Sequence, residues 1–248
     1  MDRAIHIAWV YPDILNIHGG RGDIMALNKI SEKMGLPVEI KRCEQLSEDI
    51  PFEWADIIYM TSGELKCMPE IVEALERQRD GLEKYIEKGG VVCAVSSSGA
   101  VLGNGLEKDD GSIVKGLGLL DMMWKERESV WGDDLWFSTE YGFEIMGNQI
   151  QIADVKLGEG QEPFGKTIYG RGNCGDGTEG AKKGNVIFTN CLGPMMIKNP
   201  RMAAELLKTA AETAGVTGYR MLDENDTVIE DKSFELIKIF IEKKMNEE

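Results

Sequence analysis

The chain has 248 residues, and its 28 Lys and Arg against 43 Asp and Glu give a formal net charge of −15. This excess of negative charge argues against duplex DNA or an anionic membrane surface as a partner, because both require concentrated Lys and Arg. The sequence shows no transmembrane run and no signal-peptide segment, and its five irregularly spaced cysteines do not form a disulfide framework. We therefore expect a reduced, cytoplasmic protein with a full hydrophobic core.

Strand-like and helix-like segments alternate along the first half of the chain. Buried-strand patterns at residues 4–11 and 91–95 and shorter candidates at 38–43 and 57–61 predict strands, and helical spacing of apolar residues predicts helices at 23–34 and 69–88. This alternation is typical of parallel strands joined by crossover helices. The predicted fold is an α/β layer with helices on both faces.

The second half changes character. Aromatic residues, alternation and turn signals at 132–134 and 147–148 predict antiparallel strands between residues 119 and 156. The glycine-rich segment 158–185 predicts either a loop that approaches a ligand closely or surface hairpins. We expect a strand at 185–190, a helix that Asn199-Pro200 opens, and a last amphipathic helix at 233–245. The expected organisation is one domain at 1–215 and a C-terminal helical appendage at 216–248, packed on that domain or on a partner.

One predicted strand leads directly into three serines. Val91–Val95 is followed by Ser96, Ser97 and Ser98 and then by a short helix, which is the arrangement of a nucleophile elbow. Backbone N–H groups and the positive end of the helix dipole at such a junction favour an anion. An ordinary tight turn has the same pattern, so the junction predicts a reactive side chain, an anion-binding cup or a plain turn.

Polar and small residues also follow a second predicted strand. Tyr59–Glu64 ends in a loop that contains Gly63, and parallel strands of one sheet open onto the same edge, where ligands bind. His18 follows the first strand and could also contact a ligand at this edge, whereas His6 alternates within that strand and is expected to be a packed structural residue. With two histidines and no Cys-x-x-Cys, the sequence predicts no metal site and no cofactor.

Several motifs between residues 7 and 205 together resemble the class I, triad-type glutamine amidotransferases of the cobyric acid synthase type. They occur in the family's order, and they are Tyr11–Asp23, Thr61–Leu65, Gly116–Asp121, Gly142–Glu144, Asp176–Gly180, and Leu192–Pro194 with Asn199-Pro200. The chain resembles in particular the glutaminase subunit of lipid II isoglutaminyl synthase. The resemblance implies a three-layer, flavodoxin-like sandwich with a mixed, mainly parallel central sheet, and a Mur-ligase-like synthetase as partner.

The sequence departs from the family at its catalytic positions. Aligned without a gap on the trailing Leu-Gly, the family's nucleophilic cysteine falls on Ser96 and its glutamine on Ala100. Alignment on the glycine two residues after the nucleophile selects Ser97 instead, at the cost of a gap. The catalytic histidine of the family's His-Gly-Pro becomes Leu192. The glutamine of its Gly-Gly-Gly-Gln-Asp loop becomes Glu64.

These replacements work against glutaminase chemistry. Amide hydrolysis by this route needs an ionisable nucleophile and a neighbouring imidazole. Loss of either typically costs about 10⁴–10⁶-fold in turnover. We therefore predict a non-hydrolysing protein that binds a small anionic or amino-acid ligand, or serves as a scaffold. The candidate ligand contacts are Ser97, Ser98, Gly63, Glu64, Ala100, Gly142 and Phe143.

Other functions stay open at this point. An active glutaminase or a Ser96-dependent hydrolase would need an unexpected group, such as His18 or Cys191, to replace the missing one. A stand-alone sensor of an anionic metabolite would need neither a nucleophile nor a base. A synthetase could dock on the apolar stripe of the last helix, unless the stripe packs on its own domain; it consists of Phe234, Ile237 and Ile241, with Leu236 and Phe240.

Overall fold

The computed structural model describes residues 3–247 and is built around a six-stranded sheet in the order β11-β12-β4-β3-β1-β2. All neighbouring strands in it are parallel except β11, which pairs antiparallel with β12. The predicted mixed, mainly parallel sheet is therefore confirmed. The strands are β1 Ile5–Val10, β2 Val38–Cys43, β3 Ile57–Met60, β4 Val91–Val95, β11 Ala181–Lys183 and β12 Val186–Thr189.

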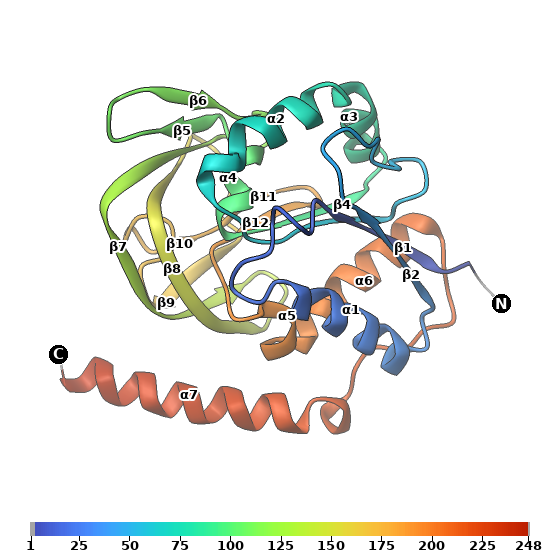
Figure 1. Ribbon diagram of the computed structural model, residues 1–248. Helices are drawn as coiled ribbons and strands as arrows, with labels where there is room; N and C mark the ends of the chain where they lie inside the picture. Colours follow the sequence, from blue (N-terminus) through green and yellow to red (C-terminus); the bar gives the residue numbers. More distant parts are fainter. Residues whose placement is uncertain (1–2, 248) are drawn as a thin grey trace.

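Helices cover both faces of this sheet (Figure 1). Successive residues of a strand point to opposite faces, so Ile7 and Trp9 of β1 pack in one core cluster and Ala8 and Val10 in the other. The first cluster also holds residues of α1 and α6, and the second holds residues of α2, α3 and α4. This is the expected three-layer sandwich. The helices are α1 Arg21–Met34, α2 Met68–Glu76, α3 Arg79–Glu87, α4 Gly99–Leu102 and α6 Pro200–Ala214.

The single helix predicted at 69–88 is wrong, because the segment forms α2 and α3 with a break at Gln78. The Gln78 side chain accepts a hydrogen bond from Ile50 N at 2.7 Å and donates one to Glu48 O at 3.2 Å. Three residues later, Gly81 lies so close to Phe52 that a Cβ would come within 2.8 Å of its ring. Packing against the loop before β3 therefore overrides the helical pattern.

The middle of the chain forms a second sheet, in the order β10-β9-β7-β5-β6, with β8 paired to β7. The predicted antiparallel strands are confirmed, but the turns expected at 132–134 and 147–148 lie inside β7 and β8. Gly147 marks a close approach of two segments, since a Cβ there would clash with Cys191 Sγ and Leu192 O. The strands are β5 Gly105–Glu107, β6 Ile113–Lys115, β7 Met122–Thr139, β8 Glu144–Leu157, β9 Gly165–Tyr169 and β10 Thr178–Glu179.

The chain ends in α7, Val228–Glu247, which begins earlier than predicted and lies along the outside of the body (Figure 1). Ile241 is fully buried, and together with Phe234 and Ile237 it packs in a small cluster with Trp136 and Met146. Three residues of the predicted docking stripe therefore pack on the protein itself. Its other two, Leu236 and Phe240, are exposed. Within residues 3–247, no helix has both the length and the apolar character needed to cross a membrane.

Candidate functional site

Ser96 occupies a strained turn at the carboxyl end of β4. It begins the short 3-10 helix Ser96–Ser98, which continues into α4. Its φ of +54° lies in the left-handed region, whereas Ser97 and Ser98 have ordinary φ values. Such a conformation costs a non-glycine residue about 1–3 kcal/mol, and a strained strand-to-helix turn is the defining geometry of a nucleophile elbow. Of the three serines, Ser96 is the one with this strained backbone.

The hydroxyls of Ser97 and Ser98 fasten this turn to the neighbouring strand. Ser97 Oγ accepts a hydrogen bond from Gly63 N at 3.0 Å and donates one to Gly63 O. The buried Ser98 Oγ lies 3.1 Å from Met60 O and 2.9 Å from Val95 O. Two of the three hydroxyls therefore hold backbone groups of the protein and are not free to line an anion-binding cup.

The other predicted contacts near the elbow differ in accessibility. Gly63 is buried, and a Cβ there would come within 2.9 Å of Ile14 O, so the loop requires glycine. Glu64 is exposed and pairs with Lys66 at 2.5 Å, at the start of the 3-10 helix Leu65–Cys67. Ala100 is fully buried in the core, so its side chain is not accessible to a ligand.

Leu192 lies just beyond the end of β12, and its backbone is hydrogen-bonded to β8. Its backbone N donates to Asn148 O at 2.7 Å, and Asn148 N donates to Leu192 O at 3.0 Å. The side chain is 4% exposed and belongs to the core cluster on the α1 and α6 face. Lys198 Nζ donates to Asn148 Oδ1 at 2.7 Å and so fixes the outer side of this contact. An apolar, buried group at this place cannot accept or return a proton.

A depression of about 490 Å³ opens beside Leu192. His18 lines it together with Leu192 and Gly193, and its imidazole is exposed. The preceding residue, Ile17, donates its N–H to Ser62 O at 3.0 Å, so the loop after β1 lies against the loop after β3. The structure therefore brings His18 to the carboxyl edge of the sheet, as the sequence predicted.

A family model for CobB/CobQ-like glutamine amidotransferase domains matches residues 6–199, more than three quarters of the chain. The chain belongs to this family. Two relatives carry the name "Lipid II isoglutaminyl synthase (glutamine-hydrolyzing) subunit GatD". The protein from Streptococcus pneumoniae is 27% identical over 214 residues, which cover 83% of this chain and 80% of the relative. The protein from Staphylococcus aureus is 26% identical over 226 residues, which cover 89% and 90%.

Solved structures agree on the fold. A glutamine amidotransferase superposes with a TM-score of 0.53 at 17% identity, covering 82% of this chain and 98% of that one. The structure of PurLQS from Thermotoga maritima gives 0.53 at 14% identity, covering 85% and 97%. The glutaminase domain of Trypanosoma brucei CTPS with bound acivicin gives 0.51 at 8% identity, covering 87% and 96%. The class I amidotransferase fold expected from the sequence is thus confirmed.

The cysteines near the elbow of this amidotransferase-like domain are buried thiols. Burial raises the pKa of Cys93, inside β4, well above its ordinary range. Cys191 is also fully buried; burial raises its pKa, and the carboxylate of Glu179 raises it further. Since the thiolate is the nucleophilic form, neither residue has the environment of a reactive cysteine. The geometry gives no support to Cys191 as a replacement for the missing group.

The glycine-rich segment forms strands and a buried network, not an open ligand loop. Glu179 in β10 is fully buried and accepts hydrogen bonds from Thr189 Oγ1 at 2.7 Å, Asn190 N at 2.8 Å and Asn190 Nδ2 at 2.9 Å. Burial raises the pKa of this carboxyl group, although the hydrogen bonds favour its charged form. Asn173 Nδ2 donates to Gly180 O at 2.9 Å and closes the network. The motif around Glu179 therefore supports the turn that leads from β12 to Leu192.

Sequence reasoning did not identify Asp23 as a buried carboxyl group. It lies in the first turn of α1, is 2% exposed, and accepts a hydrogen bond from Met196 N at 2.7 Å. Burial raises the pKa of Asp23 to about 7. The fully buried Tyr59 lies beside it, and its hydroxyl favours the charged form of the Asp23 carboxyl group, which opposes the effect of burial on the pKa of Asp23. The aspartate itself stands in the opening motif, but nothing in the sequence shows that Met196 lies opposite.

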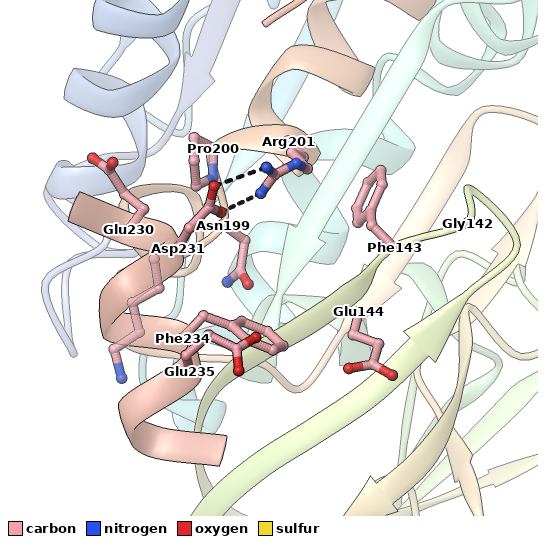
Figure 2. A pocket seen from close by; sticks show the side chains of 11 residues that line it. Gly142, Phe143, Glu144, Asn199, Pro200, Arg201, Glu230, Asp231, Phe234 and Glu235 are labelled. Atoms are coloured by element: carbon pink, nitrogen blue, oxygen red, sulfur yellow. Dashed lines mark hydrogen bonds and ion pairs between the residues drawn. The ribbon is translucent and has the colours of Figure 1, made fainter. Parts of the chain in front are cut away.

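Gly142 and Phe143, predicted as ligand contacts, lie at the turn between β7 and β8. They line a cavity of about 440 Å³, and no residue of the elbow lines it (Figure 2). On its far side Arg201, at the start of α6, donates from Nη2 to Asp231 Oδ2 of α7 at 2.9 Å. The candidate contacts therefore fall into two places, one at the elbow and one between this turn and α7.

Proposed function

We propose that this chain is a non-hydrolysing, glutamine amidotransferase-like subunit that binds a small ligand or serves as a scaffold within an amidating system. The observation that carries the proposal is Leu192, whose buried side chain stands where the family's His-Gly-Pro motif has its catalytic histidine. The two curated relatives are named as subunits of a glutamine-hydrolysing synthase. A synthetase of the Mur-ligase-like or cobyric acid type is accordingly the partner that we propose.

The chemistry at the elbow supports this reading. Without a base, the hydroxyl of Ser96 cannot be deprotonated for attack on an amide carbon. A nucleophile and its base act as one unit, so the absence of either removes about 10⁴–10⁶-fold of turnover. The exposed carboxylate of Glu64, already paired with Lys66, would also repel the negative charge that develops on the amide oxygen.

What remains is suited to binding. Ser96 keeps the strained turn, and the depression beside Leu192, which Ser96 does not line, is lined by His18 and by the carboxylates of Asp133 and Asp134. These carboxylates favour a ligand that carries an ammonium group, so an amino acid fits this depression better than a simple anion. We further propose that residues 1–215 form the binding domain and 216–248 the appendage. We place the protein in the cytoplasm, where its five free cysteines would stay reduced.

The test is a glutaminase assay on the purified chain, alone and with the Mur-ligase-like synthetase of the same genome. We expect no ammonia above the level of the Ser96→Ala variant in either condition. A glutamine-hydrolysing relative assayed in parallel shows that the conditions support turnover. Glutamine-dependent ammonia release that Ser96→Ala abolishes would overturn the proposal.

One observation favours a second function, a Ser96-dependent hydrolase with His18 as its base. Both residues stand at the carboxyl edge of the sheet, and both have a left-handed backbone. This function predicts hydrolysis of an activated ester, with Ser96 as the nucleophile and His18 as the general base. It requires that Ser96→Ala and His18→Ala each remove the activity, and equal rates in both variants and the wild type would exclude it.

A further inference from the structure

One side of α7 carries four exposed apolar residues. Ile229, Leu236, Ile239 and Phe240 are 79%, 69%, 61% and 60% exposed, respectively. Their spacings of seven, three and one residues place them on one side of an α-helix. We call these four residues the outer stripe. Exposed apolar residues are ordinary when scattered singly, but a contiguous patch of this kind marks an interaction surface.

The structure holds the outer stripe in a fixed position. Ile241 anchors the opposite side of α7 in the cluster with Trp136 and Met146. Near the end of the helix, Lys244 Nζ pairs with both carboxylate oxygens of Asp133 at 2.8 Å. The helix, which lies along the outside of the body (Figure 1), is therefore attached by its inner side, and the four residues of the stripe are exposed.

The same attachment connects α7 to the candidate site. Asp133 lines the depression that also contains His18 and Leu192. Ile150, which is paired with Gly132 in the β7–β8 hairpin, lines this depression too and is exposed. Val130 and Ile152 of the same hairpin are also exposed. We call Val130, Ile150 and Ile152 the hairpin patch; it lies at the end of α7 that Lys244 fixes.

We propose that the outer stripe and the hairpin patch form one docking surface for the synthetase subunit, which would then cover the depression beside Leu192. The inference rests on the proposed function for the existence of that subunit. Charge selects this occupant over a second copy, because two copies would bring together two chains of net charge −15 each. Beside the stripe α7 exposes both signs of charge, Lys232 and Lys243 together with Glu235 and Glu242, so the partner's groove is apolar with a rim of mixed charge.

The experiment compares two variants of the full chain. Phe240→Glu places a charge in the centre of the outer stripe. Ile113→Glu is its matched control, since Ile113 is also apolar and 61% exposed but lies in β6, away from α7 (Figure 1). The probe is the Mur-ligase-like synthetase of the same genome, and its dissociation constant for each variant is measured by titration calorimetry. Circular dichroism and melting curves check that both variants fold.

We expect Phe240→Glu to weaken binding by at least about 30-fold, as a central interface residue does, and Ile113→Glu to leave it unchanged. Wild-type complex formation that Phe240→Glu leaves intact overturns this inference and leaves the proposed function standing. Failure of the wild type to bind the synthetase overturns the proposed function, and the inference with it. A wild-type dimer that Phe240→Glu converts to a monomer shows that the surface binds a second copy, and that result also overturns the inference.

Discussion

Ser96, Ser97 and Ser98 have the same side chain, and the fold gives each a different environment. Ser96 has the left-handed, strained backbone conformation of the turn. The other two hydroxyls hold the carbonyl oxygens of Gly63 and Met60, which belong to the next strand and its loop. These hydrogen bonds join the turn after β4 to β3 and the loop that follows it.

Replacement of Ser97 by alanine should measure how much its hydrogen bonds to Gly63 stabilise the protein. The change removes the partner of Gly63 N and Gly63 O, both in a buried loop. We expect the free energy of unfolding to fall by about 1–3 kcal/mol, the cost of leaving buried polar groups unpaired. Ser96→Ala is the matched control and should change it by less than about 0.5 kcal/mol. Urea unfolding of both variants measures the two changes in the free energy of unfolding. Equal decreases for Ser97→Ala and Ser96→Ala would show that the Ser97 hydroxyl has no special structural role.

Asp23 makes stability depend on pH. Burial raises its pKa from the ordinary 3.8 to about 7 in the folded chain, so the unfolded chain releases the proton first. The free energy of unfolding should therefore decrease as pH rises from about 4 to about 7 and then level off. Asp23→Asn removes the ionisation and keeps an acceptor for Met196 N.

The Asn variant should accordingly match the wild type below pH 4 and exceed its stability above pH 7, by about 4 kcal/mol at most. Urea unfolding at pH 4.5 and pH 8 measures the two differences. Ser31→Ala, which removes a buried hydroxyl from the same helix, serves as the control and should give a difference independent of pH. A stability difference for Asp23→Asn that is larger at pH 4.5 than at pH 8 would contradict this assignment.

At the scale of elements, patterns that depend on neighbours in the sequence were predicted well. The bounds of β2 and β4 agree with the prediction. β4 is a fully buried apolar run, which leaves a direct signature in the sequence, whereas β2 is mostly exposed. The long helix at 69–88 failed because the break at Gln78 comes from contacts with residues 48–50. The glycine-rich segment was left open between loop and hairpins, because its β10 is fixed by the distant Thr189 and Asn190.

In the candidate site, too, the features that depend on local sequence could be predicted and those that depend on distant contacts could not. The elbow at Ser96 could be predicted because a strand followed by small residues is a local pattern. The contact of Asp23 with Met196 joins residues 173 positions apart, and the bridge between Asn148 and Leu192 joins two different parts of the fold. Such pairs exist only once the sheets are assembled. The apolar residues of α7 were recognised from sequence, but their division between an inner and an outer side required the structure.

For the whole molecule, α7 is the part that the two main cores do not need. Neither cluster flanking the central sheet contains a residue of α7, whose buried contacts are confined to the small cluster around Ile241. A chain that ends at residue 227 should therefore fold, with its central sheet intact. It should lose about 2–5 kcal/mol of unfolding free energy, because it no longer buries Ile241 and parts of Phe234 and Ile237. Urea unfolding followed by far-UV circular dichroism measures this loss.

A point variant of the full chain tests the same role of α7 without shortening the protein. Ile241→Ala should loosen α7 and speed amide hydrogen exchange along it, while exchange in β1 and β4 stays slow. Ile239→Ala, on the exposed side of the same helix, should change neither. Because α7 presents the outer stripe, Ile241→Ala should also weaken the synthetase complex, even though Ile241 is buried. If the shortened chain instead unfolds completely in buffer, α7 is part of the folding unit and the division at residue 215 is wrong.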